Sequence, residues 1–241
     1  MAEWYMEWFD TAYYHILYKH RDDNEALKFV SNLKSELSLP TGSTIVDLAC
    51  GKGRHSKMFN DLGFKVLGLD LSARSIHEAK SLENESLHFL VHDMREPIES
   101  ISVDVVVNLF TSFGYFEKVD DNSKVLRSVK SYLKSDGLLV IDFMNSKKVI
   151  DNLVQHESKS IQNITFNLSR FYDGRFIRKN IQVLDGEKNL TFEEKVQAFT
   201  KDELLNLLAE EGYKVEKVFG DYLLQPFDEQ TSDRLIILAR N

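Results

Sequence analysis

Thr44-Ile45-Val46-Asp47-Leu48-Ala49-Cys50-Gly51-Lys52-Gly53 is the most informative segment of this chain. An apolar, β-branched run stops at an acidic residue and continues through two glycines, after which residues 54–62 can begin a helix. This order of strand, glycine loop and helix is typical of the first unit of a nucleotide-binding α/β fold. Such a loop allows the backbone to approach a ligand closely.

The residues around the loop indicate which kind of ligand it holds. A dinucleotide site needs Gly-x-Gly-x-x-Gly, because the third glycine lets the helix pack tightly beside a bound pyrophosphate. Here Ser56 occupies the third position. The negative charge of Asp47, at the carboxyl end of the strand, would oppose a pyrophosphate but would suit a ligand that carries an ammonium and a sulfonium. S-adenosyl-L-methionine is such a ligand.

The chain resembles the class I methyltransferases that use S-adenosyl-L-methionine. Their first motif reads roughly Asp-x-x-x-Gly-x-Gly, which Asp47, Gly51 and Gly53 match. The resemblance is closest to a small bacterial branch that writes this segment as Asp-Leu-Ala-Cys-Gly-x-Gly-Arg-His, and it covers nearly the whole chain. It implies an α/β, Rossmann-like, doubly wound sheet of seven strands, mostly parallel with the last strand antiparallel. The product would be S-adenosyl-L-homocysteine.

Two further acids follow apolar runs farther along the chain. Residues 65–69 end at Asp70, where an acid about 20 residues past the glycines can accept hydrogen bonds from both ribose hydroxyls of an adenosine. Residues 87–92 end at Asp93 and Met94, and the resemblance implies that these two residues bind the adenine. Together with Asp47, the acids would close three consecutive strands and form one crevice.

An isolated aspartate at the end of a strand is more often a turn or helix-cap residue. The family spacing distinguishes the three acids above from Asp10, Asp61 and Asp104, which we interpret as surface or cap residues. Cys50 is the only cysteine, so it has no partner for an internal disulfide or a thiolate metal site. We interpret it as a small buried residue whose backbone faces the cofactor, and we expect no metal.

Composition predicts one large domain, residues 1–241, located in the cytoplasm. The 241 residues are 43% hydrophobic and 28% charged, which is ample for a core. No apolar stretch approaches the roughly 18 residues of a membrane span, and the N-terminus does not read as a signal peptide. The formal net charge of -8 disfavours general attraction to nucleic acid. The most basic stretch, residues 170–179, is either a solvated hairpin or a mouth for an anionic substrate.

Residues 4–39 look helical, with a break at Pro40, and are rich in aromatic side chains; the predicted lid segment is residues 1–39. Core packing is the ordinary explanation for rings spaced along one helical face. In enzymes of the resembled family, however, an N-terminal helix closes over the methionine end of the cofactor and helps to form the substrate pocket. We therefore predict a helical lid in which Tyr13, Tyr14 and Arg21 take part.

The remainder predicts the other strands and an insertion. Residues 103–108 and 138–143 read as buried strands, with a helix at 125–134 that Gly137 ends, and 235–239 as the closing strand. Residues 158–199 instead read as three antiparallel strands, 161–169, 176–184 and 190–199, forming a small β insertion. A homodimer, if one forms, is expected to use this insertion.

The loop at 108–115 should face the transferred methyl group. Asn108 matches the first position of the Asp/Asn-Pro-Pro-Tyr/Phe motif of nucleobase amine methyltransferases. Leu109 and Phe110 replace both prolines of that motif, so methylation of DNA is not expected and RNA is disfavoured as a substrate. We predict a small-molecule acceptor. Methyl transfer needs mainly alignment, so no catalytic base is assigned. Tyr14 and Tyr115 are the candidates, with His15 and Asp142 as further ones.

The resemblance and the strand-end pattern together give one predicted set of cofactor-binding residues: Asp47, Ala49, Cys50, Gly51, Gly53, Asp70, Leu71, Asp93, Met94, Asn108, Tyr14 and Arg21. Two alternatives stay open at this point. One is a nicotinamide-dependent oxidoreductase on the same fold, which Ser56 and Asp47 argue against. The other is a non-catalytic protein that binds S-adenosyl-L-methionine or associates with RNA.

Overall fold

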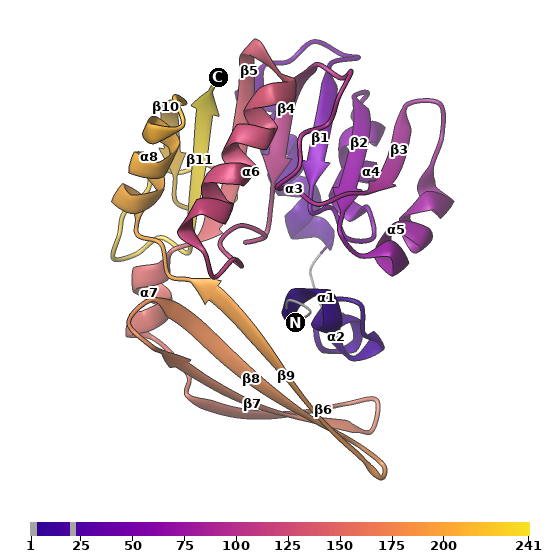
Figure 1. Ribbon diagram of the computed structural model, residues 1–241, viewed down its shortest axis with the longest axis vertical. Coiled ribbons are helices and arrows are strands. Elements are labelled where there is room, and N and C mark those ends of the chain that lie inside the picture. Colours follow the sequence, from indigo (N-terminus) through magenta and orange to yellow (C-terminus); the bar gives the residue numbers. More distant parts are fainter. Residues whose placement is uncertain (1–3, 20–22) are drawn as a thin grey trace.

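The computed structural model describes residues 4–19 and 23–241 of the chain (Figure 1). Its main body is a seven-stranded sheet with the strand order β10-β11-β5-β4-β1-β2-β3. The strands are β1 (Thr44–Leu48), β2 (Lys65–Asp70), β3 (Leu87–Val91), β4 (Val103–Asn108), β5 (Leu133–Met144), β10 (Lys214–Phe219) and β11 (Arg234–Arg240). Strands β1 to β5 pair in parallel, whereas β11 is antiparallel to both β5 and β10. The predicted Rossmann-like fold is confirmed.

Helices cover both faces of this sheet, as the near-continuous apolar strands require. Successive residues of β1 show this: Ile45 belongs to a core with α3 (Asp23–Leu37), α4 (Arg54–Asp61) and α5 (Ala73–Ala79). Val46 belongs to the opposite core, with α6 (Val119–Tyr132) and α8 (Lys201–Glu210). The sheet is therefore doubly wound, and a 3-10 turn, η1 (Lys80–Leu82), follows α5.

The segment between β4 and β5 differs from the predicted helix at 125–134. Helix α6 begins six residues earlier, at Val119, and places Asp120 and Asp121 in its first turn, where acidic side chains favour the positive end of the helix dipole. Gly137 lies inside β5 and does not end the helix. A Cβ at this position would lie 2.6 Å from the side chain of Leu133 and 2.9 Å from the carbonyl oxygen of Lys134, so a larger residue would require a local shift.

The insertion is a separate antiparallel sheet of four strands, one more than predicted. They are β6 (His156–Ile161), β7 (Ile164–Tyr172), β8 (Phe176–Asp185) and β9 (Lys188–Gln197), and α7 (Ser146–Asp151) precedes them. The sequence-based prediction missed β6 because the turn between β6 and β7 contains no glycine. Gln162 and Asn163 make this turn with φ angles of 53° and 64°, a conformation in which Asn is tolerated.

The N-terminal region is three helices and not one. Helix α1 (Trp4–Trp8) and helix α2 (Ala12–Leu17), here called the lid helices, are separated by Thr11, whose hydroxyl accepts a hydrogen bond from the backbone N–H of Tyr14. The lid helices lie between the large sheet and the insertion (Figure 1). Helix α3 belongs to the main core, so within residues 1–39 the predicted lid is considered only for α1 and α2.

Hydrogen bonds join the lid helices to the insertion. Glu194 on β9 accepts hydrogen bonds from Trp8 Nε1 (2.6 Å) and from the Tyr18 hydroxyl (2.7 Å). The Tyr13 hydroxyl donates to Asp185 (2.8 Å). Lys179 completes this group through an ion pair with Glu194 (3.4 Å). The insertion is therefore joined by hydrogen bonds to both lid helices.

The basic stretch at residues 170–179 forms the β7–β8 hairpin. Its cations pair with acids: Arg170 with Glu157 at 2.7 Å, and Arg178 with Asp173 at 2.5 Å. Arg175 instead donates a hydrogen bond to the carbonyl of Glu117, outside the insertion, at 2.9 Å. The pairing of Arg170 and Arg178 with acids of the insertion supports the solvated hairpin more than a mouth for an anionic substrate.

Candidate functional site

A cavity of about 360 Å³ opens at the carboxyl ends of β1, β2 and β4, and the lid helices close it from the other side. The predicted site residues that line it are Tyr14, Asp47, Ala49, Cys50, Gly51, Asp70, Leu71, Asp93, Met94 and Tyr115. His15 and His55 also line the cavity. The three strand-end acids therefore do lie in one crevice. Arg21 lies outside the described residues.

The two motif glycines occupy different environments. Gly51 has a φ angle of 57°, and a Cβ there would meet nothing within 4 Å, so this part of the backbone borders open space in the cavity. Gly53 has a φ angle of 80°, and a Cβ there would lie 2.5 Å from the ring of Phe89 on β3. The structure therefore gives Gly53 a packing role, because it lets the start of α4 contact β3, and only Gly51 lines the cavity.

Asp70 holds the glycine loop and the loop after β2. One carboxylate oxygen accepts a hydrogen bond from the backbone N–H of Gly51 (2.8 Å), and the other accepts one from Ser72 (2.8 Å). Burial raises the pKa of Asp70, and the two backbone hydrogen bonds oppose this shift. Each carboxylate oxygen can accept about two hydrogen bonds, so one acceptor site on each oxygen is left for a ligand.

Asp47 lies at the bottom of the cavity with only 2% of its surface exposed. Burial raises its pKa to about 6, although the hydroxyl of Ser56 donates a hydrogen bond to it at 2.6 Å and lowers the pKa in part. In the sequence, Ser56 was notable only because it occupies the third glycine position of a dinucleotide-binding motif. Ser56 lies in the first turn of α4, where its hydroxyl orients the Asp47 carboxylate.

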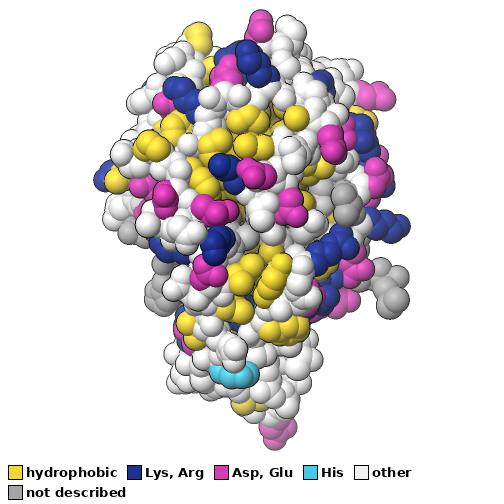
Figure 2. Space-filling model, turned by 90° about the vertical axis from the view of Figure 1, so that its left-hand side faces the viewer, with side chains coloured by type: hydrophobic (Ala, Val, Ile, Leu, Met, Phe, Trp, Pro, Cys, Tyr) yellow, Lys and Arg dark blue, Asp and Glu magenta, His cyan; other side chains and the backbone are white. Residues whose placement is uncertain are grey.

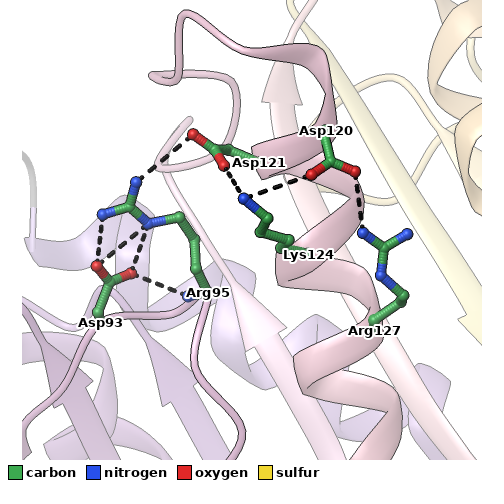
Figure 3. A network of polar contacts seen from close by, with 6 residues as sticks. All are labelled: Asp93, Arg95, Asp120, Asp121, Lys124 and Arg127. Carbon is green, nitrogen blue, oxygen red and sulfur yellow. Dashed lines mark hydrogen bonds and ion pairs between the residues drawn. The ribbon is translucent and has the colours of Figure 1, made fainter.

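Asp93 is held by Arg95, a residue that the sequence analysis did not single out (Figure 3). Arg95 Nη2 donates to Asp93 at 2.6 Å, and its Nε lies 3.0 Å and 3.1 Å from the two carboxylate oxygens. Burial alone would raise the pKa of Asp93, but the hydrogen bonds and the charge of Arg95 outweigh burial and lower it.

Asn108 and Asp142 lie behind the cavity wall. Asn108 is buried, and its Nδ2 donates to the carbonyl of Leu48 at 3.0 Å, which ties the end of β4 to β1. Asp142 is fully buried on β5 and forms an ion pair with Arg234 at 2.7 Å. Asp142 also accepts a hydrogen bond from the backbone N–H of Phe110 at 2.8 Å. Asp142 therefore fixes the loop after β4, and this contradicts its suggested use as a base.

One side of the cavity, formed by residues of the lid helices and by Tyr115, is aromatic. Phe9 contacts Tyr14 and Tyr115, with ring centroids 4.8 Å and 5.4 Å apart. Tyr5 also lines the cavity and is buried, and its hydroxyl has no hydrogen-bond partner among the described residues. Tyr13, by contrast, points to the insertion through its bond to Asp185. The helical spacing of aromatic residues did not distinguish the rings that face the cavity from those that do not.

The described ranges, residues 4–19 and 23–241, contain no helix that is both long and apolar enough to cross a membrane. They also contain no group of three or more His, Cys, Asp or Glu side chains arranged to hold a metal ion.

A fold and a cavity of this kind are typical of enzymes that act on a nucleoside-bearing ligand. Residues 40–212 match the family described as a methyltransferase domain. The putative methyltransferase YqeM of Bacillus subtilis (strain 168) is 30% identical over 203 residues, which cover 78% of this chain and 80% of the relative. The chain belongs to this methyltransferase family. This family membership confirms the predicted class of enzyme, a methyltransferase. It does not support the two alternatives, a nicotinamide-dependent oxidoreductase and a non-catalytic protein.

Other similarities agree with this family. A dTDP-4-amino-2,3,4,6-tetradeoxy-D-glucose N,N-dimethyltransferase of Saccharopolyspora spinosa is 26% identical over 189 residues, 76% of each chain. A crystal structure of an S-adenosylmethionine-dependent methyltransferase from Clostridium acetobutylicum ATCC 824 has a TM-score of 0.78 at 18% identity, covering 95% of both chains. The SAM-bound amino pentose methyltransferase CalS10 from Micromonospora echinaspora has a TM-score of 0.70 at 18% identity, covering 95% of this chain and 97% of that one.

Proposed function

We propose that the protein transfers the methyl group of S-adenosyl-L-methionine to an amine of a small molecule and releases S-adenosyl-L-homocysteine. The observation that carries this proposal is the arrangement of Asp47, Asp70 and Asp93 around one cavity that Gly51 borders. Within the family, the chain would belong to the small bacterial branch whose first motif it shares.

The residues present fit the proposed cofactor. Asp47 offers a buried carboxylate to the ammonium group, and the two open acceptor sites of Asp70 suit the two ribose hydroxyls. Asp93 and Met94 would contact the adenine. Further contacts would come from Ala49, Cys50, Leu71, Tyr14 and Arg21, while Gly53 and Asn108 shape the site from behind.

The bound cofactor supplies a methyl group that is already activated by its sulfonium. The chain must then align the acceptor with that methyl group and exclude water, and alignment alone can contribute about 7 to 11 kcal/mol to lowering the barrier. Phe9, Tyr14 and Tyr115 form an apolar wall that serves both needs. The hydroxyl of Tyr14 or Tyr115 would relay the proton lost by the methyl acceptor, taking up that proton as it releases its own to solvent.

Two observations favour an amine as acceptor. The name of the Saccharopolyspora spinosa relative specifies N-methylation of an amino sugar, and that of another relative, 26% identical over 235 residues, specifies glycine/sarcosine N-methylation in Aphanothece halophytica. The aromatic wall would also attract a substrate that carries a positive charge.

Three further proposals concern the assembly and location of the protein. The lid helices cover the methionine end of the cofactor, a homodimer would use the β insertion, and the enzyme would act in the cytoplasm. Neither DNA nor RNA is expected as a substrate. In support, Lys and Arg side chains on the face shown in Figure 2 are interspersed with Asp and Glu.

The proposal is tested by incubating the protein with methyl-labelled S-adenosyl-L-methionine and a cell extract, which is then separated into small-molecule, protein and RNA fractions. Label in amines of the small-molecule fraction is the expected result. Label confined to protein or RNA would contradict the proposed acceptor class, and a total lack of transfer would contradict the activity.

A further inference from the structure

Arg95 lies directly behind two residues of the cavity wall. Its guanidinium forms the fork-shaped ion pair with Asp93 and also lies over the ring of Phe116, 5.0 Å from the ring centroid. Asp93 and Phe116 both line the cavity. One side chain therefore supports two neighbouring parts of the wall, at the end where the adenine is proposed to bind.

Counting donors shows what the pair leaves for a ligand. Asp93 receives three N–H groups from Arg95: the backbone N–H at 2.9 Å, the Nε–H shared between both oxygens, and Nη2 at 2.6 Å. A carboxylate offers about four acceptor sites. The Nε–H divides its hydrogen bond between the two oxygens, so three N–H groups share the four acceptor sites and the carboxylate can still accept one hydrogen bond from a ligand. The three donors also fix the orientation of the carboxylate.

The guanidinium is itself held from behind by α6 (Figure 3). Arg95 Nη1 lies 3.6 Å from Asp121, which is almost fully buried and is paired with Lys124 at 2.7 Å. The same network continues through Asp120 to Arg127, whose Nη2 lies 3.1 Å from Asp120. Arg127 is half exposed and lies at the far end of the network from the cavity.

We propose that Arg95 is a positioning residue that makes the cofactor site selective for adenine. By fixing the orientation of the Asp93 carboxylate, Arg95 lets this carboxylate accept a hydrogen bond from the exocyclic amine of adenine, which is a donor. A base with an oxo group at the same place presents an acceptor to the carboxylate and is rejected, because two acceptors cannot form a hydrogen bond. This inference rests on the proposed function, since it assumes that an adenosine-bearing ligand occupies the cavity.

The test compares two ligands, S-adenosyl-L-homocysteine and its deaminated analogue S-inosyl-L-homocysteine, by calorimetry. The wild type should bind the adenosyl ligand about tenfold or more tightly than the inosyl ligand, as expected for one hydrogen bond to a charged group. Arg95→Ala should lower affinity for the adenosyl ligand about tenfold and bring the ratio of the two affinities close to one. Arg95→Lys should restore part of the ratio, because one side-chain donor to Asp93 remains beside the backbone N–H.

Arg127→Ala is the matched control, because it removes a cation from the same network without touching Asp93; its ratio should equal that of the wild type. If Arg95→Ala does not fold, as judged by circular dichroism, Arg95→Gln is measured against the same criterion. A folded Arg95 variant that keeps the wild-type ratio would overturn the inference, as would a wild type that binds both ligands equally. A wild type that binds neither ligand would overturn the proposed function as well.

Discussion

The substitution Asp47→Asn is expected to stabilise the fold at neutral pH and to impair cofactor binding. The pKa of Asp47 in the folded protein is about 6, because of burial, against about 3.9 in an unfolded chain. A difference of about two pKa units means that the ionised carboxylate destabilises the folded state by about 3 kcal/mol near pH 7.5. Asn removes the charge and can still accept the hydrogen bond from Ser56, while its unpaired amide hydrogens cost about 1 to 2 kcal/mol.

The pH dependence of the stability difference shows whether the buried charge of Asp47 causes it. A carboxyl group with a raised pKa in the folded state favours folding below its unfolded pKa, and this contribution is lost as the pH rises through about 6. The variant should therefore gain stability relative to the wild type between about pH 4.5 and pH 7.5, ending about 1 to 2 kcal/mol more stable. Urea denaturation at several pH values measures this difference, and calorimetry should show at least a tenfold loss of affinity for S-adenosyl-L-methionine.

Asp61→Asn is the control, because Asp61 is exposed and forms only a surface pair with Lys57. It should change neither the pH dependence nor the affinity. The reasoning is refuted if Asp47→Asn is less stable than the wild type near pH 7.5, or if the difference in stability between them does not vary with pH.

Three other expectations concern the ribose site, the glycine loop and the lid. Asp70→Ala should lower affinity for S-adenosyl-L-methionine at least tenfold by calorimetry, since the ribose loses its acceptor and the loop loses a support; wild-type affinity would remove Asp70 from the site. Gly53→Ala should cost about 1 to 3 kcal/mol in urea denaturation, because of its positive φ angle and the contact with Phe89; unchanged stability would contradict its packing role. Glu194→Ala should speed amide hydrogen exchange in the lid helices and weaken cofactor binding, while exchange in α4 stays constant; unchanged lid exchange would show that Glu194 does not anchor it.

The sequence predicted the sheet and the crevice well because both depend on local signals. Asp47 and Asp70 close their strands, and Asp93 follows the end of the next strand by two residues; parallel strands bring such positions to one edge of the sheet. The glycine loop could likewise be predicted from the sequence, because its glycines directly follow the first strand. What the sequence could not distinguish was the role of each glycine, since the difference between Gly51 and Gly53 depends on the ring of Phe89.

The residues that were missed act through contacts that sequence spacing does not encode. Arg234 lies 92 positions from Asp142, so neither residue indicates the other. Arg95 is close to Asp93 in sequence, but its importance depends on Phe116 in another segment. The break between the lid helices was likewise hidden, because a threonine cap is a weak signal within a long helical pattern.

The shared role of Asp47, Asp70 and Asp93 would be decided by a crystal structure of the protein with S-adenosyl-L-homocysteine. We expect the ammonium of the ligand at Asp47, both ribose hydroxyls within hydrogen-bond distance of Asp70, and the adenine amine at Asp93. A ligand bound elsewhere on the molecule, or in this cavity with its ribose away from Asp70, would contradict the assignment.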